Sequence, residues 1–440
     1  MTDVWRITAE QSEQAQRQAA AGLRDAGLQQ GDRVALILDN SPPLLATILG
    51  ALRTGVIPVL LHPGLLAHER QALLDDAEPT LVVDDAAALP TGDPRTIDLH
   101  PVPRGRPMHY TSGTSGRPKG VWTGVLDDAD AAALFEDEIT PWGFGAQSIP
   151  DTTLICSPLY HSAAVRFSAM TLLTGGTVVL AQRFDAAAVA HALEQHRPTA
   201  AFMVPAHLQR LFALQRTPDF DSFRLLVHAG APCPPALKHQ AMNATTNGEV
   251  WEFYGATEGQ FTICSPDEWL ARPGSVGKAR PKRTLTTDED GQVWCHAPPF
   301  ARFAYWRDPA KTADAWNGDA FTVGDIGRLD DDGFLYLDGR RDDLVISGGV
   351  NVYPAEVEHA ISTLPGVHEV AVFGAPDERW GQRVCAAVIG DVTPAAVTEH
   401  AARHLAPYKR PKSVYLVDDL PRTITGKVRR TALVEQLGLG

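Results

Sequence analysis

The feature that most constrains the fold is a repeated alternation between short apolar runs and helix-compatible segments. In the first quarter of the chain, DRVALIL, VIPVLL and TLVVDD are short and nearly continuously apolar, as strands buried on both faces of a parallel sheet are. SPPLLATILGAL and AHERQALLDD lie between them and have helical patterns. The alternation returns at TTLICS, GTVVLA, AAFMVP and FRLLVHAG. We therefore expect a wound α/β domain.

The pattern changes after about residue 291, where GQVWCHA and GFLYLDG make the chain richer in strands. A small α+β unit follows, with helices at AEVEHAISTL and AAVTEHAARHL and strands at EVAVFGA and RVCAAVIG. A chain of 440 residues is too long for one ordinary core. The sharpest change of composition is the charged DGRRDD at 338–343. We predict a large N-terminal domain with a β-rich subdomain at 1–341 and a small, mobile C-terminal domain at 342–440.

The net charge limits the partners. The chain carries 39 basic and 53 acidic side chains, a net charge of -14, which argues against a nucleic-acid or anionic-membrane partner. A polyanionic ligand must therefore be held by groups close to it in its binding site, because the overall negative charge of the protein repels it.

The cysteines and the apolar runs indicate a cytoplasmic protein. Its five cysteines are dispersed without a C-x-x-C pair, which favours a reducing compartment without disulfides or structural zinc. The polar start MTDVWRITAEQSEQ does not predict a signal peptide. The longest apolar run is interrupted by Arg53, Thr54, Gly55 and Pro58, so we expect no stable membrane insertion.

The segment YTSGTSGRPKG at 110–120 has the composition of an anion-binding loop. Glycines let the backbone approach an anion, successive N–H groups form a concave nest, and a lysine adds a point charge suited to phosphate. The residues that supply these groups are Thr111, Ser112, Gly113, Thr114, Ser115, Gly116 and Lys119. The spacing is not that of the G-x-x-x-x-G-K-[ST] nucleotide loop. On composition alone, such a segment is more often a plain turn than a phosphate cradle.

The complete string resembles the phosphate-binding signature of the adenylate-forming superfamily. That superfamily contains acyl- and aryl-CoA synthetases, firefly-type luciferases and the adenylation domains of peptide synthetases. Further motifs that resemble the superfamily follow in order: FYGATEG at 253–259, TVGDIG at 322–327, GRRDDLVISGGVNVYPAEVE at 339–358 and PRTITGKVRR at 421–430. The resemblance covers nearly the whole chain.

The resemblance implies an ATP and Mg²⁺ site. Glu258 and Thr111 would act in catalysis and hold the metal ion, since carboxylate and hydroxyl oxygens are hard ligands. Asp325 and Arg340 would bind the ribose. The other residues that it assigns to the nucleotide, beside those of the 110–120 segment, are Gly230, Ala231, Pro232, Tyr254, Gly255 and Thr257. On residue type alone, Glu258 and Asp325 also fit ordinary loop positions, Tyr254 also fits the core, and Arg340 equally fits a solvated surface.

The resemblance also implies a reaction in two steps. ATP and a small-molecule carboxylic acid would give an acyl-AMP and pyrophosphate, with Lys427 stabilising the transition state. The C-terminal domain would then rotate about Asp342, and Gly349 would give the thiol of coenzyme A access to the adenylate. Relatives are monomers or homodimers.

The substrate pocket is predicted around His161, Arg166 and Val204. A lone histidine such as His161 is more often a packing residue, whereas the resemblance places it at the carboxylate site and makes it catalytic. Arg166 lies in an otherwise apolar helical stretch, so it either faces the surface or pairs with a polar or anionic substrate tail.

The chain departs from the family pattern in two places. Its N-terminus is short, and the link between GKARPKR and FAYW lacks the usual longer β segment, with the unusual wording CHAPPFARFAYW. The sequence therefore leaves other acceptors open: a carrier protein, an amine, or nitrite activation for diazotisation of an aryl amine. A nucleotide-binding regulator without catalysis is the remaining alternative, which the presence of Lys427, Glu258, Asp325 and Arg340 disfavours.

Overall fold

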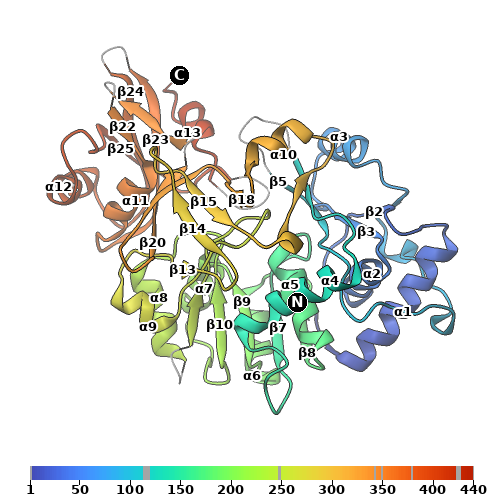
Figure 1. The fold of residues 1–440 in the computed structure, drawn as a ribbon. Helices are drawn as coiled ribbons and strands as arrows, with labels where there is room; N and C mark the ends of the chain where they lie inside the picture. Colours follow the sequence, from blue (N-terminus) through green and yellow to red (C-terminus); the bar gives the residue numbers. More distant parts are fainter. Residues whose placement is uncertain are drawn as a thin grey trace. The chain divides into compact units, whose positions relative to one another are not determined.

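The structure is a computed structural model that describes residues 2–111, 119–245, 249–340, 343–347, 350–377, 380–422 and 428–439. It is a mixed α/β molecule with a large N-terminal and a small C-terminal domain, as predicted (Figure 1). Contacts divide it into a first unit, Met1–Thr284 with Cys295–Phe321, and a second unit, Leu285–Trp294 with Thr322–Gly440. The predicted boundary at 341/342 falls outside the described residues and stays a prediction.

The first sheet of the first unit has the strand order β1-β8-β7-β9-β10-β11. Its strands are β1 (Val4–Thr8), β7 (Thr152–Ile155), β8 (Thr177–Ala181), β9 (Ala200–Met203), β10 (Leu225–His228) and β11 (Val250–Glu252). All neighbours are parallel except β1, which runs antiparallel to β8. The sequence analysis did not predict β1, which extends the sheet with the first residues of the chain.

Helices cover both faces of this sheet, which explains why its strands read as continuous apolar runs. Successive residues alternate between two cores: Ile155 packs with Phe167 of α5, whereas Leu154 packs with Val189 of α6 and Leu208 of α7. The helices are α5 (Ser162–Leu173), α6 (Ala186–His196), α7 (Pro205–Phe212) and α8 (Pro235–Ala244).

The second sheet has the strand order β16-β6-β5-β3-β2-β4. Its strands are β2 (Arg33–Leu36), β3 (Ile57–Leu60), β4 (Leu81–Val83), β5 (Met108–Thr111), β6 (Lys119–Trp122) and β16 (Ala304–Tyr305). The pairs among β2, β3, β4 and β5 are parallel, and β6 is antiparallel to both β5 and β16. The late segment Ala304–Tyr305 is thereby placed beside β6.

The N-terminal helices have clear start and stop signals. Helix α1 (Ala9–Asp25) begins with a capping box between Thr8 and Gln11. Helix α2 (Pro42–Thr54) follows a Ser41 cap and ends at Gly55, whose φ of 78° is left-handed. These local signals explain why both helices can be predicted from the sequence.

The remaining α-helices and strands of the first unit are short, apart from α3 and α4. They are α3 (Ala67–Ala77), α4 (Asp128–Ile139), β12 (Thr262–Ile263), α9 (Pro266–Ala271), β13 (Lys278–Ala279), α10 (Pro309–Ala315), β17 (Trp316–Asn317) and β18 (Ala320–Phe321). Strands β14 (Thr284–Thr287) and β15 (Val293–His296) lie where the chain passes between the residue ranges of the two units.

The second unit contains two sheets. Strands β19 (Asp325–Leu329) and β20 (Leu335–Arg340) form an antiparallel pair. The other sheet contains β21 (Val345–Ser347), β22 (Val350–Val352), β23 (Val367–Asp377), β24 (Gly381–Gly390) and β25 (Ser413–Leu416). Helices α11 (Pro354–Ser362), α12 (Pro394–His404) and α13 (Arg430–Gln436) complete the unit, which has its own apolar core.

The five cysteines are free thiols, and all are buried except Cys233, which is half-buried. Burial raises the pKa of the Cys156, Cys264 and Cys295 thiols to about 12. The Cys233 pKa is raised to about 12 by burial and the nearby Glu252 carboxylate, and burial also raises that of Cys385. Within the part of the chain that the structure describes, no helix combines the length and apolarity needed to cross a bilayer.

Candidate active site

The predicted phosphate loop closes a hairpin of the second sheet. Strands β5 and β6 pair so that Thr111 lies opposite Lys119. The loop residues Ser112, Gly113, Thr114, Ser115 and Gly116 lie outside the described residues. The ammonium of Lys119, at the described end of the loop, lies 5.5 Å from the centre of the Tyr305 ring.

Three predicted binding segments follow neighbouring parallel strands of the first sheet. Met203, His228 and Glu252, at the ends of β9, β10 and β11, are in register. The chain therefore continues into Val204, Gly230 and Tyr254 at one carboxyl edge, where ligands of wound α/β sheets bind. Gly230, Ala231 and Pro232 are exposed, and a Cβ at Gly230 would lie 3.5 Å from Val204. The edge thus joins the predicted adenine and substrate segments.

The turn after Tyr254 needs a glycine. Gly255 forms a bridge with Gln260, and a Cβ at Gly255 would lie 2.8 Å from the Gln260 Cα and from the Gly259 carbonyl oxygen. Tyr254 is half-buried, and its ring centre lies 4.9 Å from that of Phe261. This tight turn fixes the path of the chain into Thr257 and Glu258.

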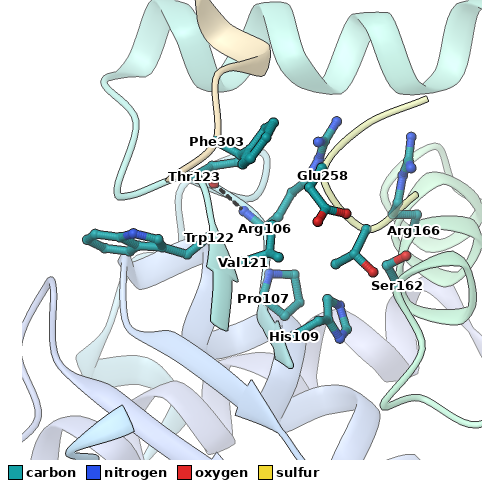
Figure 2. A pocket seen from close by; sticks show the side chains of 11 residues that line it. Arg106, Pro107, His109, Val121, Trp122, Thr123, Ser162, Arg166, Glu258 and Phe303 are labelled. Atoms are coloured by element: carbon teal, nitrogen blue, oxygen red, sulfur yellow. Dashed lines mark hydrogen bonds between the residues drawn. The ribbon is translucent and has the colours of Figure 1, made fainter. Parts of the chain in front are cut away.

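Glu258 lies in a pocket between the two sheets of the first unit (Figure 2). It is 8% exposed, so it is not an exposed loop residue. The hydroxyl of Tyr305 donates a hydrogen bond to the Glu258 Oε1 atom over 2.9 Å. Burial and the Glu258 charge raise the pKa of Tyr305 far above its ordinary value, so its proton stays on the hydroxyl. The pocket is lined by Arg106, Pro107, His109, Val121, Trp122, Thr123, Ser162, Arg166, Thr257, Glu258 and Phe303.

Two histidines lie at the start of α5. His161 is half-buried and occupies the N-cap position of α5 without a capping hydrogen bond from its side chain, and its ring centre lies 4.8 Å from that of Tyr160. His109 on β5 is 5% exposed, and its Nδ1 lies 3.0 Å from the Tyr160 carbonyl oxygen. Burial, with the nearby charges of His161, Arg166 and Arg106, lowers the pKa of His109 to about 3.

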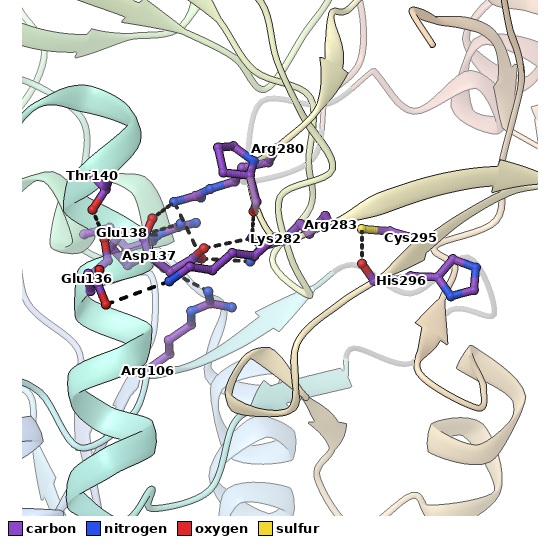
Figure 3. A network of polar contacts seen from close by, with 12 residues as sticks. Arg106, Glu136, Asp137, Glu138, Thr140, Arg280, Lys282, Arg283, Cys295 and His296 are labelled. Atoms are coloured by element: carbon purple, nitrogen blue, oxygen red, sulfur yellow. Dashed lines mark hydrogen bonds and ion pairs between the residues drawn. The ribbon is translucent and has the colours of Figure 1, made fainter.

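Two residues of the pocket lining, Arg106 and Arg166, belong to a buried ion-pair network (Figure 3). Glu138 on α4 accepts a 2.9 Å hydrogen bond from Arg106 Nη2 and a 2.7 Å hydrogen bond from Arg166 Nε. The Arg166 and Glu138 side chains are only 12% and 9% exposed. The surface-facing alternative for Arg166 is therefore wrong, because the guanidinium has an internal carboxylate partner.

A second carboxylate, Asp137, extends the network. Its Oδ2 lies 2.9 Å from Arg283 Nη2 and 3.7 Å from Arg280 Nη2, and these three side chains are at most 2% exposed. Burial lowers the pKa of Arg280 to about 10. With Arg106, Arg166 and Glu138, the network holds four guanidinium groups and two carboxylates.

The two residues predicted to bind the ribose are paired through their backbones in the second unit. Asp325 is 6% exposed, and its backbone is directly opposite Arg340 in the β19–β20 pair. Their spacing of fifteen positions is therefore closed by a hairpin. The predicted catalytic lysine Lys427, hinge Asp342 and Gly349 lie outside the described residues.

The sequence analysis did not single out Tyr305, His109 or Glu138. Tyr305 belongs to the unusual segment CHAPPFARFAYW, which we noted only as a departure from the family pattern. It reaches Glu258 because β16 pairs with β6, with Tyr305 opposite Val121. No local sequence signal reports such long-range pairing. His109, in contrast, could have been noticed from the sequence, because it is a polar residue in the strand before the glycine-rich loop.

Comparison with family models gives two matches that together cover most of the chain. Residues 2–104 and 107–294 match the model described as AMP-binding enzyme, and residues 356–427 match the AMP-binding enzyme C-terminal domain. These matches include most of the first unit and most of the small C-terminal domain.

Individual proteins are similar over nearly the whole chain. The long-chain-fatty-acid–CoA ligase FadD13 of Mycobacterium tuberculosis is 32% identical over 99% of this chain and 94% of its own length. A structure of O-succinylbenzoate coenzyme A synthetase from Bacillus subtilis with ATP and magnesium ion is 27% identical, with a TM-score of 0.82 over 96% of this chain and 94% of that one. The amide bond synthetase McbA from Marinactinospora thermotolerans is 27% identical, with a TM-score of 0.83 over 97% and 94% of the two chains.

Proposed function

Because the chain belongs to the AMP-binding enzyme family, we propose that it activates a carboxylic acid with ATP and transfers the acyl group to coenzyme A. The observation that carries this proposal is the grouping of Lys119, Tyr305 and Glu258 at the end of the phosphate-loop hairpin. There, Tyr305 contacts both Lys119, a cation suited to phosphate, and Glu258, a carboxylate suited to a metal ion.

The first step forms a mixed anhydride. A carboxylate oxygen of the acid attacks the α-phosphorus of ATP, the bond from that phosphorus to its bridging oxygen breaks, and pyrophosphate leaves. Positive groups directed at the reacting phosphate stabilise the charge that develops in the transition state. We assign this role to Lys427, and phosphate binding to Lys119 and the loop residues 112–116.

The residues around Glu258 fit a magnesium ion that is carried by the nucleotide. No group of three or more His, Cys, Asp or Glu side chains suited to a metal lies among the described residues. Mg²⁺ bound with ATP needs only one or two carboxylates, because phosphate and water oxygens complete its octahedron. Glu258 would hold the ion, with Thr111 as a second ligand, and Tyr305 would fix the carboxylate. When bound, Mg²⁺ would neutralise phosphate charge.

The second step transfers the acyl group. The CoA thiolate attacks the acyl carbon, the bond from that carbon to the AMP oxygen breaks, and AMP leaves with the electron pair, while the thiol proton passes to solvent. We propose that the C-terminal domain exchanges Lys427 for the Gly349 segment between the steps, with Asp342 as the hinge.

An amine acceptor is the second candidate for this step, and the similarity to an amide bond synthetase supports it. The attacking nitrogen would then replace sulfur, with AMP leaving in the same way. Carrier-protein thiols and nitrite chemistry remain arms of the same experiment, because all of these reactions share the adenylating first half.

The test is a pyrophosphate-release screen over fatty, aryl and amino-aryl acids, without an acceptor and with CoA, a carrier protein with a phosphopantetheine thiol, a primary amine or nitrite. We expect acid-dependent pyrophosphate release, and a CoA thioester by mass spectrometry in the CoA arm. Glu258→Gln should lower release about 100-fold at limiting magnesium, because an amide is a poor ligand for Mg²⁺. Glu289→Gln, which changes an exposed glutamate, is the matched control and should keep full activity. Release that does not depend on the acid would contradict the proposal.

A further inference from the structure

The pocket around Glu258 contains a buried acceptor that the adenylation chemistry does not use. We propose that His109 Nε2 accepts a hydrogen bond from a neutral hydroxyl or amino substituent of the acid, and so selects hydroxy- or aminoaryl-type acids over unsubstituted ones. This inference rests on the proposed function, because it names the class of acid that the same site takes.

The contacts of His109 settle which nitrogen accepts. Its Nδ1 lies 3.0 Å from the Tyr160 carbonyl oxygen, and a carbonyl can only accept, so Nδ1 carries the proton. The buried ring lies in the same pocket as Arg106 and Arg166, beside which a further positive charge is disfavoured. With the ring proton on Nδ1, the lone pair of Nε2 is free to accept a hydrogen bond.

That acceptor is unsatisfied in the absence of a ligand. His109 Nε2 is fully buried and has no hydrogen-bond partner among the described residues. Buried polar groups without partners are rare and destabilising, so a ligand group that donates a hydrogen bond to Nε2 gains binding free energy. Figure 2 shows the His109 ring among the lining side chains, near Ser162 and Pro107.

The size of the pocket limits the ligand group. Its volume of about 20 Å³ accommodates one water-sized group, since roughly 10–15 Å³ is needed to hold a water molecule. A single hydroxyl or amino group matches this space, whereas a second carboxylate with three heavy atoms does not. The acid must therefore present a small polar substituent here.

The charges around the pocket exclude a cationic donor. Arg106 and Arg166 line the same pocket as His109. They belong to the network with four guanidinium groups and two carboxylates, and Glu258 is the third carboxylate nearby. An ammonium group would add to an excess of positive charge. Phenols, alcohols and aromatic amines donate a hydrogen bond while remaining neutral.

The experiment compares matched acids in the pyrophosphate-release assay. Benzoic, cinnamic and octanoic acids are each tested with hydrogen, hydroxyl, amino or fluorine at the position farthest from the carboxyl group. Fluorine is close to a hydroxyl group in size but cannot donate a hydrogen bond, and the amino group on octanoic acid is an ammonium. On the scaffold that turns over best, we expect kcat/KM for the hydroxy or aromatic amino acid to exceed that of the unsubstituted and fluoro acids by about 10-fold or more.

Variants of His109 separate recognition from folding. His109→Leu should remove the preference for acids with a hydrogen-bond donor, mainly through a higher KM for the donor-bearing acid. His109→Gln places an amide oxygen near the position of Nε2 and should keep part of it. His400→Gln changes a buried histidine of the second unit and should leave the preference at its wild-type value. If His109→Leu does not fold, the preference of the wild-type enzyme and that of the His109→Gln variant still test the inference.

Each outcome supports or overturns the inference. Equal kcat/KM values for hydroxy and fluoro acids, or a preference that survives in His109→Leu, would overturn it while leaving adenylation intact. Preference for the ammonium-bearing octanoate would overturn the charge argument. Pyrophosphate release with none of the acids would overturn the proposed function, and this inference with it.

Discussion

Replacing Glu138 by glutamine removes the carboxylate that lies between two buried guanidinium groups. Glu138 accepts hydrogen bonds from Arg106 Nη2 over 2.9 Å and from Arg166 Nε over 2.7 Å, and these side chains are 9–12% exposed. Solvent therefore screens the interactions weakly. Removing one partner of a buried ion pair typically costs about 3–5 kcal/mol, because the remaining charges stay buried without compensation. We expect the Glu138→Gln variant to lose about that much unfolding free energy.

The pH dependence identifies the cause of the loss. Burial alone would raise the pKa of Glu138, but Arg166, Arg106 and Arg280 outweigh it and hold the pKa well below its ordinary value of 4.5. A carboxyl with a depressed pKa contributes its full stabilisation above the unfolded pKa and loses it as the pH falls toward the folded pKa. The difference between wild type and variant should stay constant from about pH 8 to about pH 5.5 and shrink below about pH 4.5.

Urea unfolding followed by tryptophan fluorescence measures this difference, read from the midpoint at an unchanged slope. Glu136→Gln is the matched control on the same helix. The Glu136 carboxylate is 67% exposed and lies 3.8 Å from Lys282, so its loss should cost less than about 1 kcal/mol. Equal midpoints for the two variants, or a difference that does not change at low pH, would refute the reasoning.

Three further predictions address the site. Tyr305→Phe removes the 2.9 Å hydrogen bond to Glu258 and should raise the magnesium concentration for half-maximal activity about 10-fold; an unchanged magnesium titration would contradict the positioning role. Lys427→Ala should lower pyrophosphate release about 100-fold or more while ATP binding, measured by calorimetry, persists; undiminished release would exclude the assigned role. Gly255→Ala places a Cβ 2.8 Å from Gln260 Cα and should lower stability by about 1–3 kcal/mol, which thermal unfolding would detect as a lower midpoint.

The fold of the first unit follows largely from local patterns. The runs at β2, β3, β9 and β10 are apolar because helices cover both sheet faces, and that burial is visible in the sequence. Strand β1 was missed because VWRIT alternates and lies at a sheet edge. Its pairing with β8 depends on residues more than 160 positions away.

The candidate site divides in the same way. The segments that contain Gly230 and Tyr254 could be proposed from the sequence because contiguous motifs carry them. The partner of Arg166 could not be predicted, because Glu138 lies 28 positions upstream on another helix. The sequence therefore could not distinguish a surface position of Arg166 from an internal ion pair. Tyr305 reaches Glu258 through a pairing between β16 and β6, and packing of this kind leaves no periodic trace.

The burial of the native thiols has a practical consequence for measuring motion. Maleimide reagents are attacked by thiolates, and buried cysteines with raised pKa values supply few thiolates. Cys233→Ser would remove the half-buried thiol and give a background suited to fluorescent labelling. One engineered surface cysteine in each unit would then carry one dye of a donor–acceptor pair. Energy transfer between the two dyes during turnover would follow the separation of the two units in real time.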